Sequence, residues 1–312
     1  MDYLTFLRAL HDQLQPRTYV EVGVREGGSL SLSRVPSIGI DPAFSINREL
    51  AAPCHVFRTT SDEYFARPQP LAPFGKEPID LAFIDGMHLS EFALRDFINI
   101  ETFSHWAGLV IFDDMLPRTV AEAARGRHTL QWTGDVYKII GILRRLRPDL
   151  VVTLVGTKPT GLLLVHGLDP QSRVLADAYP DLERECVTED PQPVPKETLL
   201  WSEAVEPEDV ISSPLWSTLR SARESGVTRD EGFPGMREAT AAQISAMSKV
   251  APPQIPITRP WPANASAPKG NSPRPASRAV KAQTSKAPSA PPRPLWRREA
   301  SRVLRGLDRR IR

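Results

Sequence analysis

The chain has few cysteines, few histidines and no long apolar run. Its 312 residues include two cysteines, Cys54 and Cys186, and six histidines. Two cysteines cannot form a disulfide framework or a Cys-x-x-Cys metal site, and they suit a reducing compartment. No stretch approaches the roughly 18 apolar residues of a membrane span, and the N-terminus, which is acidic at Asp2, lacks the apolar core of a signal peptide. We therefore expect a cytoplasmic protein.

Two common nucleotide-binding motifs are also missing. No Gly-x-x-x-x-Gly-Lys-[Ser/Thr] sequence is present to hold the phosphates of ATP. The turn Glu21-Val-Gly-Val-Arg-Glu-Gly-Gly28 follows a predicted strand, but Arg25 stands where a dinucleotide fingerprint needs its middle glycine, which lets the backbone approach a pyrophosphate. The turn therefore fits a cofactor without a pyrophosphate better than NAD or FAD. A plain tight turn is the alternative.

Charge and proline are distributed unevenly along the chain. Residues 251–312 hold 14 basic and two acidic residues (+12) and twelve of the 31 prolines, whereas residues 1–250 hold 25 basic and 35 acidic residues (−10). We predict one domain over residues 1–168 and an appended, partly helical segment over 169–250. A disordered linker rich in Pro, Ala, Ser and Lys is predicted over 251–294, where no core can form.

The final stretch, residues 295–312, places a tryptophan and several aliphatic residues among seven arginines. This pattern predicts a basic amphipathic helix, which would contact an anionic membrane surface or a partner protein. A solvated tail is the alternative. Nothing in the tail indicates sequence-specific recognition of nucleic acid. The expected localisation is therefore cytoplasmic, with a peripheral membrane contact through this helix, and a homo-oligomer is compatible with the sequence.

Apolar runs alternate with helical patterns over the first half of the chain. Strands are predicted at 18–22, 37–40, 55–58, 79–84, 108–112, 151–155 and 161–165. Helices are predicted at 3–14, 29–34, 62–65, 89–103 and 136–146, with shorter helical patterns within 171–190 and 196–224. Asp135 is expected to be the N-cap of the helix over 136–146. The alternation predicts an α/β fold: a doubly wound, mostly parallel seven-stranded sheet with an antiparallel terminal strand.

Acidic residues follow two of these predicted strands. Asp85 ends the fourth strand, and Asp113 and Asp114 end the fifth. Ligands of open α/β sheets bind beyond the carboxyl ends of the strands, so these carboxylates are expected to gather at one edge. Oxygen-only ligands favour Mg²⁺ over zinc. His88, three residues past Asp85, is the candidate general base because its ordinary pKa lies near working pH. Strand-end acids and a solvated histidine are the alternative.

Asp41 follows the second strand, 18 residues after Gly23. An acid at this distance from a glycine turn can bond both hydroxyls of a ribose. A loop acid or helix cap before Pro42 is the alternative.

These features together resemble the class I S-adenosylmethionine-dependent methyltransferases, over about residues 15–168. Within that class they are similar to the small-molecule O-methyltransferase group that includes macrocin- and mycinamicin-type and cephalosporin-hydroxylase-like enzymes. The motifs that carry the resemblance are Tyr19-Val-Glu-Val-Gly-Val-Arg-Glu-Gly-Gly-Ser29, Ile38-Gly-Ile-Asp-Pro42, Asp80-Leu-Ala-Phe-Ile-Asp-Gly-Met-His88 with Asp96 downstream, Gly108-Leu-Val-Ile-Phe-Asp-Asp114 and Trp132-Thr-Gly-Asp-Val-Tyr-Lys138.

The resemblance implies a Rossmann-like methyltransferase domain that binds S-adenosyl-L-methionine. It implies cofactor contacts from Glu21, Gly23 and Gly27 at the methionine side, Asp41 at the ribose and Ser61 or Asp62 at the adenine, and Asp85 is also expected to bind the cofactor. In metal-dependent members, acids that match Asp85, Asp113 and Asp114 bind Mg²⁺, and the residue that matches His88 serves as the base.

The resulting hypothesis is a Mg²⁺-assisted O-methylation of a small-molecule or sugar hydroxyl. A metal-independent methyltransferase with the same cofactor is one alternative. A non-catalytic, methyltransferase-like binding module is another.

Overall fold

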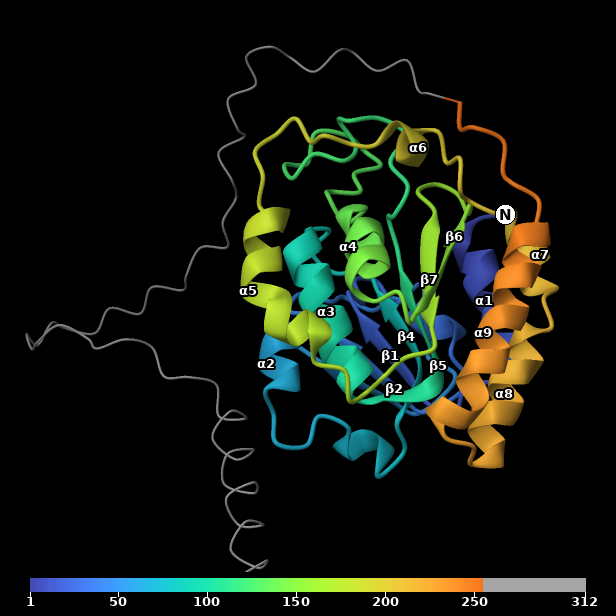
Figure 1. The fold of residues 1–312 in the computed structure, drawn as a ribbon. Helices are drawn as coiled ribbons and strands as arrows, with labels where there is room; N and C mark the ends of the chain where they lie inside the picture. The colour runs from blue at the N-terminus through green and yellow to red at the C-terminus, as the bar shows by residue number, and fades with distance from the viewer. Residues whose placement is uncertain (255–312) are drawn as a thin grey trace, which may run out of the picture. The chain divides into compact units, whose positions relative to one another are not determined.

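The computed structural model describes residues 1–254, and a seven-stranded sheet lies at the centre of this part of the chain (Figure 1). The strand order is β3-β2-β1-β4-β5-β7-β6. The strands are β1 Tyr19–Val22, β2 Ser37–Ile40, β3 Cys54–Phe57, β4 Ile79–Ile84, β5 Ser104–Phe112, β6 Val151–Val155 and β7 Leu162–His166. Strand β7 runs opposite to the other six strands, which are parallel to one another. The predicted α/β class and mostly parallel sheet are confirmed, and the antiparallel strand is the last one along the chain.

The central strands form where short apolar runs can be buried on both faces. Every residue of β1, β2 and β4 is buried, as expected for parallel strands covered by helices on both sides. Successive side chains point to opposite faces, so Val20 and Val22 join one core and Tyr19 joins the other. The edge strand β3 is less covered, and its His55 is exposed.

Helices cover both faces of the sheet. One core contains side chains of α2, α3, α4 and α5, and the other contains side chains of α1, α7, α8 and α9. Figure 1 shows α3, α4 and α5 on one side of the strands and α1, α8 and α9 on the other. The helices are α1 Tyr3–Leu14, α2 Ser61–Phe65, α3 Ser90–Thr102, α4 Lys138–Leu146, α5 Val174–Cys186, α6 Lys196–Leu199, α7 Pro207–Ile211, α8 Leu215–Ser225 and α9 Arg229–Ala246, with 3₁₀ helices η1 Leu30–Leu32 and η2 Ala72–Phe74.

The helix predicted after the glycine turn is only a single 3₁₀ turn, η1. The serines of this segment bond locally instead of leaving the backbone free to extend a helix. The hydroxyl of Ser31 donates to the carbonyl of Gly28, and that of Ser33 donates to the carbonyl of Val35. The chain therefore turns quickly from the end of β1 towards β2.

Asp135 does not cap the helix that follows it. Helix α4 begins at Lys138, and its N-cap position, Tyr137, makes no side-chain capping bond. The carboxylate of Asp135 instead accepts from the backbone N–H of Ser90, 2.8 Å away, at the first residue of α3. The predicted N-cap role is wrong because sequence spacing indicates only local partners, and here a helix start 45 residues away takes the bond.

The two C-terminal segments predicted from the sequence fall almost wholly outside the described residues. Of the predicted linker 251–294, the structure describes only 251–254, which contain no helix or strand. The predicted basic helix 295–312 lies outside it. Residues 169–250 contribute α5 to α9 to the same compact unit as residues 1–168, and the division at 168 stays a prediction. Among residues 1–254, no helix has the length and apolarity needed to cross a membrane.

Candidate active site

The register of the central strands brings the predicted site residues into one row. Val22 of β1 pairs with Ile40 of β2 and with Ile84 of β4, and Ile84 pairs with Phe112 of β5. The residues that follow these four strand ends are Gly23, Asp41, Asp85 and Asp113. Because the four strands are parallel, these residues lie side by side at the carboxyl edge of the sheet.

Gly23 allows the glycine turn to touch the end of β4. Its φ is +92°, and a β-carbon added to it would lie 1.8 Å from the carbonyl oxygen of Asp85. Its backbone N–H donates to the carbonyl of Ile40 at 2.9 Å. A side chain at this position would therefore separate the turn from two strands. Gly27 is the second positive-φ glycine of the turn, at +79°.

Glu21 lies behind the turn, in the core on the α1 side. It is fully buried, and its carboxyl group accepts from the hydroxyls of Tyr19 (2.5 Å) and Ser29 (2.8 Å). Burial raises the pKa of Glu21 to about 8, against the opposing effect of these two hydrogen bonds. The Glu21 side chain thus holds Ser29, which follows the glycine turn, and its predicted place at the methionine side of the cofactor stays a prediction.

Asp41 is tied to the glycine turn. One carboxylate oxygen accepts from the backbone N–H of Arg25 at 2.7 Å, and the other accepts from that of Ala43 at 2.6 Å. Each oxygen retains a free lone pair for a further donor. The two backbone contacts orient the carboxylate along the edge between β1 and β2, where the ribose was expected.

The predicted adenine-side residues contact α3. Asp62 forms an ion pair with Arg95, with 2.5 Å between Oδ1 and Nε. Ser61 bonds the carboxyl group of Asp96, whose burial raises its pKa to about 7. Asp96 also lies beside Gly86, with Oδ2 3.6 Å from the place of an added β-carbon. The structure thus links α2 to the turn after β4 through Asp96, and the adenine contact of Ser61 or Asp62 stays a prediction.

Asp85, His88 and Asp114 form the tightest group of titratable side chains at this edge. Nε2 of His88 lies 3.1 Å from Oδ1 of Asp85, and Nδ1 lies 2.8 Å from Oδ2 of Asp114. One ligand atom from each residue lies within 4.8 Å of the others. All three side chains are partly exposed, at 27%, 22% and 14% for Asp85, His88 and Asp114. The group is therefore accessible to a ligand.

Two members of this group have unusual backbone conformations. His88 has φ +56° and Asp114 has φ +60°, and neither is a glycine. Arg25 in the glycine turn, at φ +49°, is a third such residue at the same edge. Strained backbone of this kind concentrates at functional sites, where the surrounding structure holds it.

Asp113, predicted as a third metal ligand, has a different local role. Its Oδ1 accepts from the backbone N–H of Asp114 at 2.8 Å. Burial, and then the charges of Asp114 and Asp85, raise the pKa of Asp113 well above its ordinary value. The carboxylate thus orients Asp114 and lies next to the group of three rather than within it. Its assignment as a ligand stays a prediction.

The two carboxylates govern the charge of His88. Burial alone would lower the pKa of this imidazole, but hydrogen bonds to Asp114 and Asp85 and their negative charges outweigh burial and raise the pKa to about 11. In this arrangement His88 is a cation that balances two acids. To act as the predicted base, His88 must be neutral. Another positive charge would then have to balance Asp85 and Asp114.

The donor set of this group suits a divalent cation. Two carboxylate oxygens and one imidazole nitrogen converge, with Asp113 beside them. Carboxylates favour Mg²⁺ or Mn²⁺, and the imidazole also suits Mn²⁺ and zinc. The residues present therefore fit a cation held by Asp85 and Asp114. His88 would serve either as a ligand or as a base, because a nitrogen bound to a metal cannot accept a proton.

Two further residues, Trp132 and Tyr3, lie near this group or act on its charges and were not predicted as site residues. The indole of Trp132 stacks on the imidazole of His88, with ring centres 5.0 Å apart and planes 6° apart. Its carbonyl oxygen lies 3.2 Å from Nδ1 of His88. Tyr3, at the first residue of α1, has its pKa raised by burial and then by the charges of Asp113, Asp85 and Asp114. The available signal for Trp132 was its place at the start of the motif Trp132-Thr-Gly-Asp-Val-Tyr-Lys138, in a long loop.

A cavity of about 600 Å³ lies apart from these residues, between α4 and the chain from Glu185 to Glu203. Its wall includes Leu116 and Tyr137, from either end of the loop after β5, but none of the predicted site residues. The cavity therefore does not mark the chemistry of the carboxyl edge.

Part of the chain matches a family of known proteins. Residues 20–115 match a family model described as a methyltransferase domain. This match runs from β1 to just past Asp114, so it includes the glycine turn, Asp41 and both acid-ended strands, and it confirms the resemblance predicted from these motifs. No match was found among curated proteins.

Several solved structures are similar to part of the chain. They include the O-methyltransferase from Bacillus cereus in complex with SAH (15% identity, 52% of this chain and 79% of that chain, TM-score 0.38). A putative caffeoyl-CoA O-methyltransferase from Staphylococcus aureus is 18% identical over 53% of this chain and 83% of that chain, with a TM-score of 0.38. The O-methyltransferase TomG from Streptomyces achromogenes, in complex with SAM, is 20% identical over 52% of this chain and 78% of that chain, with a TM-score of 0.37. Likenesses at this level identify neither substrate nor site residues.

Proposed function

We propose that this chain, whose residues 20–115 match a family model described as a methyltransferase domain, transfers the methyl group of S-adenosyl-L-methionine to a hydroxyl of a small molecule or sugar. The observation that carries the proposal is the group of Asp85, His88 and Asp114 at the same sheet edge as the glycine turn and Asp41. Open α/β sheets bind ligands at this edge. The methyl donor and the acceptor would therefore meet there.

The cofactor would lie over the ends of β1 and β2. The turn at Gly23 and Gly27 would present its backbone to the cofactor, and Asp41 has lone pairs left to accept from two ribose hydroxyls. Arg25 stands where a dinucleotide fingerprint has the glycine that lets a pyrophosphate approach, whereas S-adenosyl-L-methionine has no pyrophosphate. The local chemistry thus supports this cofactor over a dinucleotide.

His88 is the proposed base. Its Nδ1 faces the carbonyl of Trp132, which can only accept, so a neutral imidazole keeps its proton on Nδ1 and offers the lone pair of Nε2. The acceptor hydroxyl would lose its proton to Nε2 while its oxygen forms a bond to the methyl carbon. The electron pair of the broken carbon–sulfur bond would remain on sulfur, which gives S-adenosylhomocysteine. Since the sulfonium is already electrophilic, the protein mainly supplies positioning, worth up to about 7–11 kcal/mol in favourable cases.

We further propose that Asp85 and Asp114 hold Mg²⁺. A divalent cation there would lower the pKa of a bound hydroxyl and orient it. The cation would also balance the charges of both carboxylates, so that His88 could be neutral and act as the base. This supports the metal-assisted reaction over a metal-independent one. The metal-independent reaction is the second candidate, because His88 already balances the charges of Asp85 and Asp114 without a metal. In that reaction a protonated His88 could not take the proton, and another group would have to do so.

The test is formation of S-adenosylhomocysteine by the full chain with a panel of phenols, vicinal diols and sugars, in Mg²⁺ or in EDTA. We expect turnover in Mg²⁺, its loss in EDTA, and its loss in His88→Gln. His55→Gln is the matched control, because His55 is exposed on the edge strand β3. Full turnover in EDTA would select the metal-independent reaction. Full turnover of His88→Gln would remove the proposed base.

A further inference from the structure

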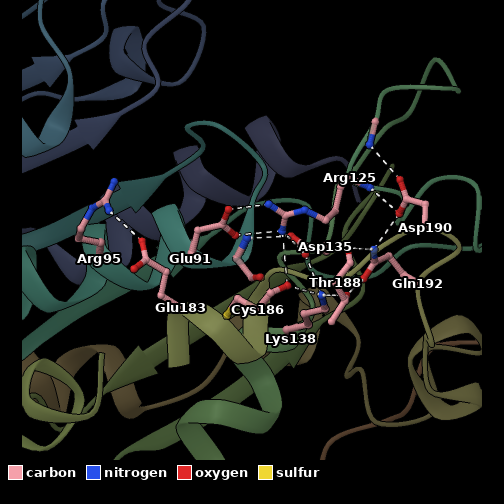
Figure 2. Close-up of polar contacts among 12 residues, drawn as sticks. Glu91, Arg95, Arg125, Asp135, Lys138, Glu183, Cys186, Thr188, Asp190 and Gln192 are labelled. Atoms are coloured by element: carbon pink, nitrogen blue, oxygen red, sulfur yellow. Dashed lines mark hydrogen bonds and ion pairs between the residues drawn. The ribbon is translucent and has the colours of Figure 1, made fainter. Parts of the chain in front are cut away.

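A buried group of charged side chains joins the loop after β5 to the start of α3 (Figure 2). The loop, residues 113–137, contains no helix or strand. Near its middle, Arg125 donates from Nη1 and Nη2 to the carboxylate of Glu91, at 3.0 and 2.6 Å, and from Nη1 to Asp135 at 2.7 Å. Glu91 and Asp135 are buried. One guanidinium thus bridges two carboxylates that lie 44 positions apart in the chain.

Trp132 lies inside the segment that this bridge closes. Its indole N–H donates to the carbonyl of Ala124 at 2.5 Å, and Ala124 directly precedes Arg125. On the other side, Asp135 follows Trp132 by three residues. The bond between Arg125 and Asp135 therefore ties together the two ends of the segment that carries the indole.

The same bridge fixes this segment to the element that carries the candidate base. Glu91 follows His88 by three residues, in the first turn of α3. Asp135 bonds the backbone N–H of Ser90 at 2.8 Å. We infer that Arg125 is a positioning residue, which holds the indole of Trp132 parallel to the imidazole of His88 by joining the loop to the start of α3.

A third segment, at the end of α5 and just after it, also binds this part of the loop. The backbone N–H groups of Arg125 and Gly126 donate to the carboxylate of Asp190, at 3.0 and 3.3 Å. Lys138 donates to Asp135 at 2.9 Å and to the carbonyl of Cys186 at 2.7 Å. Figure 2 shows Arg125 lying between Glu91 and Asp135, with Lys138 and Asp190 on its other sides. The chain after α5 thus holds the same part of the loop.

These contacts decide which substitution is informative. Arg125→Lys keeps the positive charge, but one ammonium group cannot reproduce the planar fork that reaches Glu91 and Asp135 together. Asp135 retains Lys138, so the variant leaves no carboxylate of this group without a cation nearby. The matched control is Arg145→Lys, because Arg145 makes a similar fork to Glu185 on the exposed side of α4 and does not contact the loop.

The first measurement is independent of activity. The full chain has six histidines, and loss of one imidazole signal in His88→Gln identifies that of His88 in an NMR spectrum. We expect the ring current of Trp132 to shift this signal upfield in the native chain, and Trp132→Leu to abolish the shift. Arg125→Lys should move the signal to its position in Trp132→Leu, while Arg145→Lys leaves it unchanged. An unmoved signal in Arg125→Lys would overturn the inference.

The second measurement rests on the proposed function. If Arg125 acts through Trp132, a misplaced indole should lower kcat by about tenfold in Arg125→Lys, with KM for S-adenosyl-L-methionine little changed. The double variant Arg125→Lys/Trp132→Leu should then have the same kcat as Trp132→Leu alone, because two changes that act through one contact are not additive. If the fold losses in kcat of the two single variants multiply in the double variant, Arg125 acts by another route. If the native chain transfers no methyl group, the proposed function fails, and the NMR shift alone decides the role of Arg125.

Discussion

The α-carbon of Gly23 faces the backbone of Asp85 with no space for a side chain between them. A β-carbon on Gly23 would lie 1.8 Å from the Asp85 carbonyl oxygen, and Gly23 has φ +92°. The backbone N–H of Asp85 in turn donates to the carbonyl of Val22 at 2.8 Å. The glycine turn and Asp85 are therefore packed as one unit, so a change in one displaces the other.

Gly23→Ala should disrupt this unit. The positive φ costs an alanine more than about 1 kcal/mol, and forcing a methyl group into packed backbone costs about 1–3 kcal/mol more. We expect the free energy of unfolding, measured by urea denaturation, to fall by several kcal/mol. Gly28→Ala is the control, because an added β-carbon there meets nothing within 4 Å and its φ is not in the left-handed region. Equal stability of the two variants would contradict the packing described for Gly23.

Glu21 should make stability depend on pH. Its folded pKa of about 8 lies above its ordinary value of 4.5, because the carboxyl group is buried. The folded chain therefore binds the proton more tightly, so the stabilisation present at low pH is lost as pH rises from about 4.5 to about 8, by at most about 1.4 kcal/mol per pH unit. Glu21→Gln should flatten this slope, measured by urea denaturation at intervals from pH 5 to 9.

The exposed Glu26, in the same turn, provides the control for Glu21. Glu26→Gln should leave the slope of the native chain unchanged. Identical slopes for Glu21→Gln and the native chain would mean that Glu21 is ionised in the fold, despite its burial.

The adjacent acids after β5 should differ in their effect on cation binding. Asp114 lies within the group that could hold a cation, whereas the side chain of Asp113 accepts from the Asp114 backbone. Outer partners of a metal site typically contribute 10–100-fold in affinity. We therefore expect Asp113→Asn to weaken Mg²⁺ binding by about tenfold and Asp114→Asn by more than about 100-fold, measured by calorimetry. Equal losses would favour the three-aspartate site predicted from the sequence.

Much of the fold follows from the sequence because its strands are short apolar runs that end sharply in acid. Helix α1 and strands β2, β4 and β6 have the predicted bounds. Parallel pairing then brings Asp41, Asp85 and Asp113 to one edge without further information. The sequence was therefore sufficient to predict that these three residues lie together at one edge of the sheet.

The arrangement within that set was not predictable. Asp113 and Asp114 are neighbours in sequence, and only the positive φ of Asp114 turns its carboxylate towards His88 while Asp113 bonds the backbone. Trp132 reaches His88 along a loop whose path depends on long-range bonds, such as that from Arg125 to Glu91. The spacing of residues along the sequence does not predict such long-range partners.

Helix α9 was missed for a different reason. Its 18 residues bury only three side chains, those of Phe233, Met236 and Thr240, and they include Gly232 and Pro234. The segment therefore lacks both the apolar stripe and the uninterrupted helix formers that sequence reasoning relies on. Tertiary contact stabilises it, including the packing of the Phe233 ring against Gly167.

Binding of S-adenosyl-L-methionine tests the central claim most directly, because it needs no acceptor. We predict that calorimetry of the full chain detects one cofactor molecule per chain. Loss of hydrogen bonds to a charged group costs about 1.5–3 kcal/mol, so Asp41→Asn should weaken binding by about 10- to 100-fold. Asp12→Asn, at an exposed position on α1, should leave the affinity unchanged. Absence of binding to the native chain at millimolar cofactor would contradict the account.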